Sequence, residues 1–181
     1  EAKGVSEQEA LSYVAGYTVI NDISNRKFQP NPNRKERPKD KFFDWLHGKW
    51  HDSFCPCGPC ITSSNAIDNP QQLDLTLRVN GQVHQDASTS QQVFPVAAVI
   101  EFISSFVTLE PGDIISTGTT AGVGSAKGKF LKNGDSVEAS IEGAQFQCLR
   151  HEDVPTCRRH KADHRRDLMG PRGCDDKANG S

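Results

Sequence analysis

The sequence has few apolar residues and no long apolar run. Hydrophobic residues make up 35% of the 181, a low share for a compact domain. No stretch of 18 consecutive apolar residues occurs, so we expect no transmembrane helix, and no signal-peptide pattern is present.

An excess of charge of either sign is also missing. The formal net charge is −2, so there is no basic field of the kind that attracts nucleic acid. The polybasic surface that holds a protein on an anionic membrane is absent as well. We therefore expect neither a nucleic-acid partner nor a membrane partner.

The shortage of apolar residues is concentrated in residues 151–181, which contain no Ile, Phe, Tyr or Trp and are dense in both signs of charge. Such a segment cannot bury enough apolar surface to offset the entropy that it loses on ordering. We predict one folded domain over residues 1–150 and a disordered tail over 151–181. No internal repeat is visible.

Cysteine is not scarce. The sequence has six, and three of them lie in FCPCGPC (Cys55, Cys57, Cys60). This spacing also occurs in zinc and iron–sulfur sites, and a structural Cys/His zinc module that also uses the tail is one hypothesis. Small buried thiols in a Pro-Gly turn are the simpler interpretation. Residues 1–150 are rich enough in secondary structure to form a core without disulfides, so we expect a reduced, cytoplasmic protein without zinc.

Helices are expected in two or three places. Ser6-Glu7-Gln8-Glu9 has capping-box spacing, and a helix is predicted from about Ser6 to Ala15, ended by Gly16. Apolar residues at helical spacing predict a second helix over 95–106. The aromatic-rich segment 42–54 is either a short helix or a turn over the site.

Strands account for most of the remaining pattern. Leu73, Leu75, Leu77 and Val79 alternate with polar residues before Asn80-Gly81, which predicts a β-hairpin. Further strands are predicted at 17–23, 113–117, 136–141 and 145–149. The fold class is therefore α+β, mainly β.

VINDISNR (19–26) places Asp22 directly after an apolar, β-branched run, with Arg26 four residues later. One interpretation is a turn at the end of a strand with a nearby salt bridge. The other is a metal ligand beside an arginine that binds an anion, because the planar guanidinium suits a carboxylate.

Several separate blocks share one resemblance: GYTVINDISNR, RKERPKDKFFDWLHGKWHDSF, GPCI, LRVNGQVHQDASTSQQVFPV and LEPGDIISTGTTAGVG. In order and spacing they resemble the fumarylacetoacetate hydrolase family, from about residue 1 to Leu149. The resemblance implies a rolled, mixed β-sheet that forms a homodimer. It also implies Mg²⁺ or Mn²⁺, which prefer oxygen ligands, and a 2-oxo or β-diketo acid substrate.

The resemblance assigns roles to individual residues. It implies that Asp22 is a metal ligand, that Arg26 and Gln29 bind substrate, and that Lys49 and Thr119 both bind substrate and act in catalysis. The first four also have plainer interpretations: a cap or turn aspartate, an arginine in a salt bridge, a loop glutamine and a solvated lysine.

Departures from the family pattern limit these implications. The family's Glu-x-Glu metal ligands and its lid His and Glu lie upstream of the residue that matches position 1. The chain begins EAKG without Met, so we expect that it is part of a longer protein and that an upstream segment is missing. The expected activity is hydrolysis of a C–C bond in an acylpyruvate or fumarylpyruvate-like acid. The alternatives are a 2-oxo acid decarboxylase or isomerase of the same family, or an inactive fragment that acts as a binding or dimerisation module.

Overall fold

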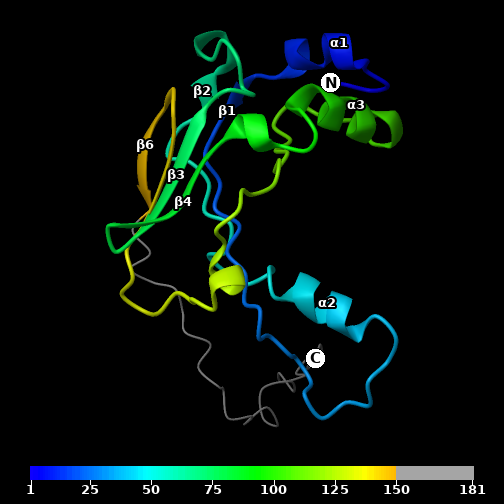
Figure 1. Ribbon diagram of the computed structural model, residues 1–181. Helices are drawn as coiled ribbons and strands as arrows, with labels where there is room; N and C mark the ends of the chain where they lie inside the picture. Colours follow the sequence, from blue (N-terminus) through cyan, green and yellow to red (C-terminus); the bar gives the residue numbers. More distant parts are fainter. Residues whose placement is uncertain (150–181) are drawn as a thin grey trace, which may run out of the picture.

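Two antiparallel sheets form the frame of the protein in the computed structural model, which describes residues 1–149 (Figure 1). The larger sheet has the strand order β4-β3-β5-β6. Its strands are β3 (Asp74–Val79), β4 (Gln82–Ser88), β5 (Val137–Ile141) and β6 (Ala144–Leu149). The smaller sheet pairs β1 (Gly16–Tyr17) with β2 (Thr62–Ser63). The predicted tail 151–181 lies outside the described residues.

The β3–β4 hairpin confirms the strongest strand prediction. Asn80 and Gly81 form its turn with positive φ angles of 51° and 76°, which asparagine and glycine tolerate best. Behind the hairpin, Val19 and Ala139 are buried and pack with Leu77 and Ile141. Residue 19 and its neighbours therefore pack against the inner face of the sheet.

A second core joins the N-terminal segment to helix α3. Helix α1 (Glu7–Ala10) continues into a 3₁₀ turn over Leu11–Tyr13 and lies beside α3 (Val96–Phe106), as Figure 1 shows. Ala2, Val5, Ala10 and Ile100 are buried between these segments. The predicted capping box forms only in part, because the Ser6 hydroxyl donates to the Glu9 carboxylate (2.7 Å) and caps no backbone amide.

One strand prediction was too long, and another was wrong. Within 17–23, regular pairing ends at Tyr17, and only an isolated bridge joins Ile20 to Cys57. Residues 113–117 form no strand in the structure. Strand assignment requires a partner in register. Residues 17–23 meet their neighbours through scattered backbone hydrogen bonds, from Asn21 to Pro56 and from Gly58 to Val19, whereas Asp113 donates within its own turn, to Glu110.

Helix α2 (Asp40–His47) lies away from the large sheet (Figure 1) and is held by two arginines of the preceding loop, Arg34 and Arg37. Arg34 donates from Nε to Asp40 (3.0 Å) and from a terminal nitrogen to Asp44 (2.7 Å). Asp40 is buried, and the backbone amide of Arg37 also donates to it (2.8 Å). Arg34 thus fastens the loop over 28–39 to the first turns of α2.

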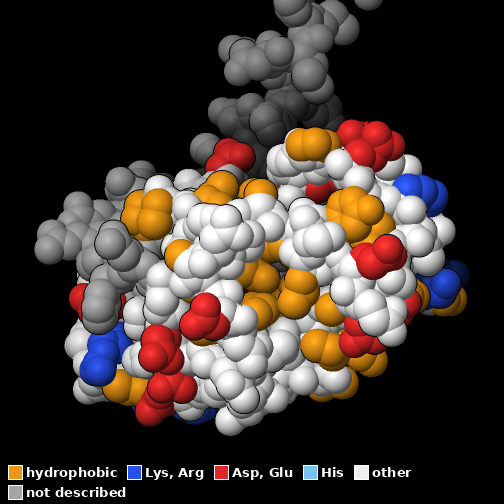
Figure 2. Space-filling model, turned by 90° about the horizontal axis from the view of Figure 1, so that it is seen from above, with side chains coloured by type: hydrophobic (Ala, Val, Ile, Leu, Met, Phe, Trp, Pro, Cys, Tyr) orange, Lys and Arg blue, Asp and Glu red, His pale blue; other side chains and the backbone are white. Residues whose placement is uncertain are grey.

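The α1–α3 end of the molecule is not wholly polar. Seen from above in Figure 2, apolar side chains gather in the middle of this face with acidic side chains around them. On α3, Phe102 and Phe106 are largely exposed. No helix within residues 1–149 has both the length and the apolar character needed to span a bilayer.

Candidate functional site

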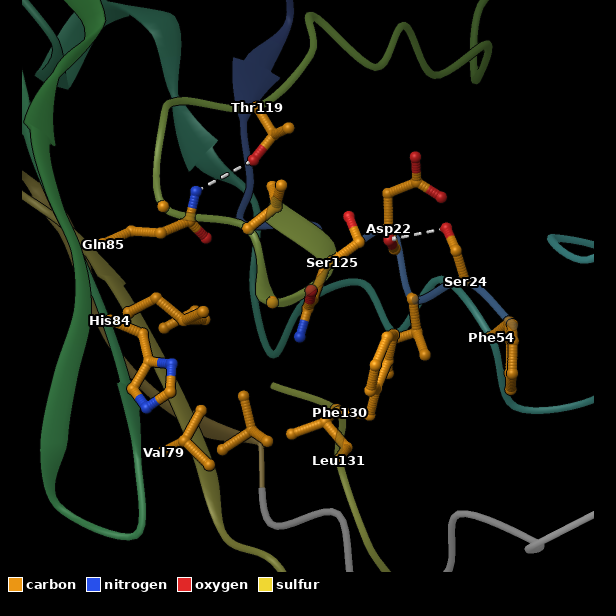
Figure 3. A pocket seen from close by; sticks show the side chains of 18 of the residues that line it. Asp22, Ser24, Phe54, Val79, His84, Gln85, Thr119, Ser125, Phe130 and Leu131 are labelled. Atoms are coloured by element: carbon orange, nitrogen blue, oxygen red, sulfur yellow. Dashed lines mark hydrogen bonds between the residues drawn. The ribbon is translucent and has the colours of Figure 1, made fainter. Parts of the chain in front are cut away.

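A cavity of about 1110 Å³ lies between residues 19–27, the inner face of the large sheet and the loop over 116–135. Asp22 and Arg26 line it from one side, and Thr119 lines it from another. Figure 3 shows Asp22 and Thr119 with Gln85, His84 and Ser125 around this space. Residues far apart in the sequence therefore meet at one hollow.

Lys49 and Asp22 are the central charged pair of the site. The Lys49 ammonium forms a short ion pair with a carboxylate oxygen of Asp22 and also donates to the Ser24 hydroxyl (3.2 Å). Its side chain is 19% exposed, while that of Asp22 is 47% exposed. The ammonium also lies 5.3 Å from the centre of the Trp45 ring, a favourable cation–π contact. The plainer interpretation of Lys49, a solvated lysine, is thus wrong, because its ammonium is positioned and largely buried.

Backbone docking explains why these two side chains meet. The amide of Asn25 donates to the carbonyl of Gly48 (2.7 Å), next to Lys49. A Cβ at Gly48 would lie 2.4 Å from the Asn25 carbonyl oxygen, so glycine permits this approach. The segment after α2 is therefore laid against the segment after Asp22.

The other predicted substrate residues differ in position. Arg26 lines the cavity, lies 5.8 Å from the Trp45 ring centre and forms no ion pair within the described part of the chain. Its guanidinium is thus available to an anionic ligand. Gln29 is exposed and is not among the residues that line the cavity.

The cysteines correct one prediction. Cys55, Cys57 and Cys60 are exposed free thiols, so small buried thiols are the wrong interpretation. The Asn21 amide donates to the Pro56 carbonyl (3.1 Å), which brings Cys55 close to Asp22. Partial burial, and then the nearby Asp22 carboxylate, raise the pKa of the Cys55 thiol.

Two residues of the site were given no role from the sequence. His51 lines the cavity with its ring between Phe28 and Phe54, at centroid distances of 4.7 and 4.9 Å, and its buried Nε2 has no hydrogen-bond partner. Gln85 on β4 reaches the Thr119 hydroxyl (3.1 Å). A histidine in an aromatic-rich segment, or a glutamine in an alternating strand, gives no local signal of either position.

The described residues do not form a complete site for a hard cation. Mg²⁺ and Mn²⁺ need several oxygen ligands. Within residues 1–149, no three His, Cys, Asp or Glu side chains are grouped so that they could hold a metal ion. Asp22 offers one carboxylate, already paired with Lys49. The described residues therefore supply one carboxylate ligand, Asp22, and not a complete set of metal ligands.

Comparison with known proteins gives a consistent result. The model of the fumarylacetoacetate (FAA) hydrolase C-terminal family matches residues 1–153. The chain is 44% identical to 2,4-didehydro-3-deoxy-L-rhamnonate hydrolase from Sphingomonas sp. (strain SKA58), covering 79% of this chain and 49% of that protein. It is 42% identical to a mitochondrial oxaloacetate tautomerase of Bos taurus, covering 77% and 43%.

A solved structure adds the fold. Maleylpyruvate hydrolase from Sphingobium sp. SYK-6, in complex with manganese(II) and pyruvate, superposes with a TM-score of 0.68 at 30% identity, covering 82% of this chain and 48% of that one. The chain spans about half the length of the curated relatives it matches. The predicted fold class is confirmed, and the chain belongs to the fumarylacetoacetate hydrolase family.

Proposed function

We propose that this chain forms the C-terminal, substrate-binding part of a hydrolase that cleaves a C–C bond in an acylpyruvate or fumarylpyruvate-like β-diketo acid. The observation that carries the proposal is the Lys49 ammonium, held by Asp22 and Ser24 at the edge of a cavity that Arg26 and Thr119 line. Cleavage of such a bond releases a pyruvate enolate, whose oxygen carries the developing negative charge.

Each side chain has a task in this chemistry. The Lys49 ammonium can stabilise the enolate oxygen, because a preorganised cation in a partly buried site acts more strongly than one in water. Arg26 can bind the substrate carboxylate through two parallel hydrogen bonds. Thr119 can contact the same ligand from the opposite loop.

A divalent cation belongs to the proposal as well. Mg²⁺ or Mn²⁺ would be held by Asp22 together with ligands from outside the described residues, and it would polarise a chelated 2-oxo acid. The structure of a manganese- and pyruvate-bound maleylpyruvate hydrolase at 30% identity supports this choice of ion. The tasks given to Lys49, Arg26 and Thr119 do not depend on the ion.

A second activity also has support. The bovine relative at 42% identity is an oxaloacetate tautomerase, an enzyme that moves a proton within a 2-oxo acid without breaking a C–C bond. Both activities pass through an enol or enolate, so Lys49 would serve either one. Decarboxylation of a 2-oxo acid and an inactive binding or dimerisation module remain as further alternatives.

One set of assays separates these functions. The purified protein is mixed with Mn²⁺ and either acetylpyruvate or the enol form of oxaloacetate, and the enol absorbance and the released pyruvate are followed. Hydrolysis gives pyruvate and acetate from acetylpyruvate, whereas tautomerisation removes only the oxaloacetate enol absorbance. Turnover of neither substrate by a folded protein would overturn the enzymatic proposal and favour the binding module.

The homodimer is a separate proposal. The exposed phenylalanines of α3 support it, since contiguous apolar surface often marks an interface between proteins. Light scattering coupled to size exclusion measures the mass in solution, and a monomer at all concentrations would contradict it.

A further inference from the structure

Gln85 is a buried polar residue for which the proposed function gives no task. It lies in the middle of β4, and its side chain is 8% exposed. A buried amide is tolerated only where it finds hydrogen-bond partners. The partners of Gln85 are therefore informative about what this position is for.

Within the described residues, the hydrogen-bond partners of the Gln85 side chain belong to three consecutive residues of the cavity loop, 119–121. The amide nitrogen of Gln85 lies 3.1 Å from the Thr119 hydroxyl and 3.0 Å from the Thr120 hydroxyl. It also lies 2.9 Å from the Thr120 carbonyl and 3.4 Å from the Ala121 carbonyl. Figure 3 shows Gln85 and Thr119 facing each other across the dashed hydrogen bond.

The two carbonyls decide which end of the amide faces the loop. A backbone carbonyl can only accept, so the side-chain nitrogen, and not the side-chain oxygen, must face Thr120 and Ala121. An amide nitrogen only donates. The nitrogen has two protons for four nearby oxygen atoms, of which the Thr119 hydroxyl is one. Because the nitrogen does not accept, the Thr119 proton points away from Gln85.

The loop is also pressed against the same strand. Gly122 has a φ of 102°, and a Cβ there would lie 2.5 Å from the carbonyl oxygen of His84. The exposed Thr119 side chain lines the cavity, so its free proton can reach an oxygen atom of a ligand there. The close docking of the loop keeps Thr119 beside an amide nitrogen that cannot accept, which excludes the direction toward Gln85 for the hydroxyl proton.

We infer that Gln85 is a positioning residue that makes Thr119 a hydrogen-bond donor toward the carboxylate or enolate oxygen of a bound 2-oxo acid. The inference rests on the proposed function, because it needs a ligand with an oxygen acceptor in the cavity. Gln85 itself does not touch the ligand. It acts through Thr119.

A double-mutant cycle tests this coupling. Binding of oxalate, a planar mimic of the pyruvate enolate, is measured by calorimetry for wild type, Gln85→Leu, Thr119→Val and the double variant. Each single variant is expected to bind about tenfold more weakly, the effect of one lost hydrogen bond. The double variant is expected to match Thr119→Val, and additive losses would overturn the inference.

Gln85→Glu adds a pH-dependent readout, because a carboxyl group there is charged at neutral pH and neutral at acid pH. A carboxylate there accepts from the Thr119 hydroxyl and reverses its direction, so oxalate binding is lost at neutral pH. At acid pH the carboxylic acid regains a donor, and binding relative to wild type at the same pH recovers. A loss that stays constant with pH would count against the inference. Gln82→Leu, on the exposed part of β4, is the matched control and leaves binding unchanged.

A ligand-free measurement separates the two proposals. In the ¹⁵N-labelled protein, the side-chain amide signals of Gln85 are expected to shift in Thr119→Val and to stay close to wild type in Thr119→Ser. Unchanged signals in Thr119→Val overturn the Gln85 inference even if oxalate binds. If the signals shift but wild type binds no oxalate, the contact stands and the proposed function fails.

Discussion

Lys49 and Asp22 form an ion pair across 27 positions of sequence, directly beside the backbone hydrogen bond from Asn25 to Gly48. The pair depends on how the segment after α2 is docked, and not only on the attraction between two charges. Its partial exposure implies that the pair itself adds little to stability. We therefore expect the Lys49–Asp22 pair to act in ligand binding.

Asp22→Ala tests this expectation. In the full-length protein we expect the substitution to abolish Mn²⁺ binding, followed by electron paramagnetic resonance. The unfolding free energy should change by less than about 1 kcal/mol, because partly exposed ion pairs contribute little. Asp86→Ala, exposed on β4 outside the cavity, is the control and keeps full metal affinity. Unchanged affinity in Asp22→Ala would remove this carboxylate from the site.

Acid should weaken the attachment of α2. The backbone hydrogen bond from Arg37, and then the side chains of Arg37 and Arg34, hold the pKa of Asp40 below its usual range. A carboxyl with a lowered folded-state pKa contributes stability above its unfolded-state value of about 4, and loses it as pH falls toward the folded-state value.

We therefore expect the urea midpoint of wild type to fall as pH drops below about 4, the usual carboxyl range. Asp40→Asn should have a lower midpoint at pH 7 and a flatter dependence in the acid range. Asp135→Asn is a useful comparison, because Asp135 also has a lowered pKa, from the Asn80 side chain and the Lys132 amide, but lies far from α2. A wild-type slope that survives in Asp40→Asn would contradict this explanation.

Two adjacent serines on α3 offer a matched pair. The Ser104 side chain is fully buried and accepts from the Val5 backbone amide (3.1 Å), whereas the exposed Ser105 hydroxyl donates only to its own helix. Ser104→Ala leaves the Val5 amide unpaired in the core and should cost about 1–3 kcal/mol in chemical denaturation. Ser105→Ala should change stability by less than about 0.5 kcal/mol. Equal effects would show that the Val5 contact does not stabilise the protein.

Gly118 and Gly122 test the docking of the cavity loop. Both have a φ of 102°, but a Cβ at Gly118 meets no atom within 4 Å, whereas one at Gly122 would clash with the His84 carbonyl. Gly118→Ala should cost about 1–3 kcal/mol from backbone strain alone. Gly122→Ala should cost clearly more and also weaken oxalate binding. If thermal unfolding shows that the two variants are equally stable, the close approach of Gly122 to β4 does not contribute to stability.

Much of the fold could be predicted because its signals are local. Asn80-Gly81 between alternating residues specifies a hairpin, and the apolar spacing over 95–106 specifies a helix, with no information from elsewhere in the chain. Residues 17–23 show the limit of this reasoning. Their β-branched residues favour an extended backbone, but the partner for Ile20 is Cys57, and sequence alone gives no register between them.

The site divides in the same way. Asp22 was predicted to bind metal, and Arg26, Gln29, Lys49 and Thr119 to bind substrate. The structure places Asp22, Arg26 and Thr119 around one cavity with Lys49 beside it, and leaves Gln29 outside the lining. Their individual roles stay predictions. Gln85 was missed because its importance comes from a loop 34 to 36 positions away, which no pattern in β4 reports.

The attachment of Arg34 to Asp40 and Asp44 also bears on how this region can change in evolution. The connecting loop is fastened to α2 at Arg34, so residues inserted or deleted between Lys27 and Asn33 need not displace the helix or the lysine that follows it. Natural variants are therefore expected to tolerate length changes on the near side of this arginine and to reject them on the far side.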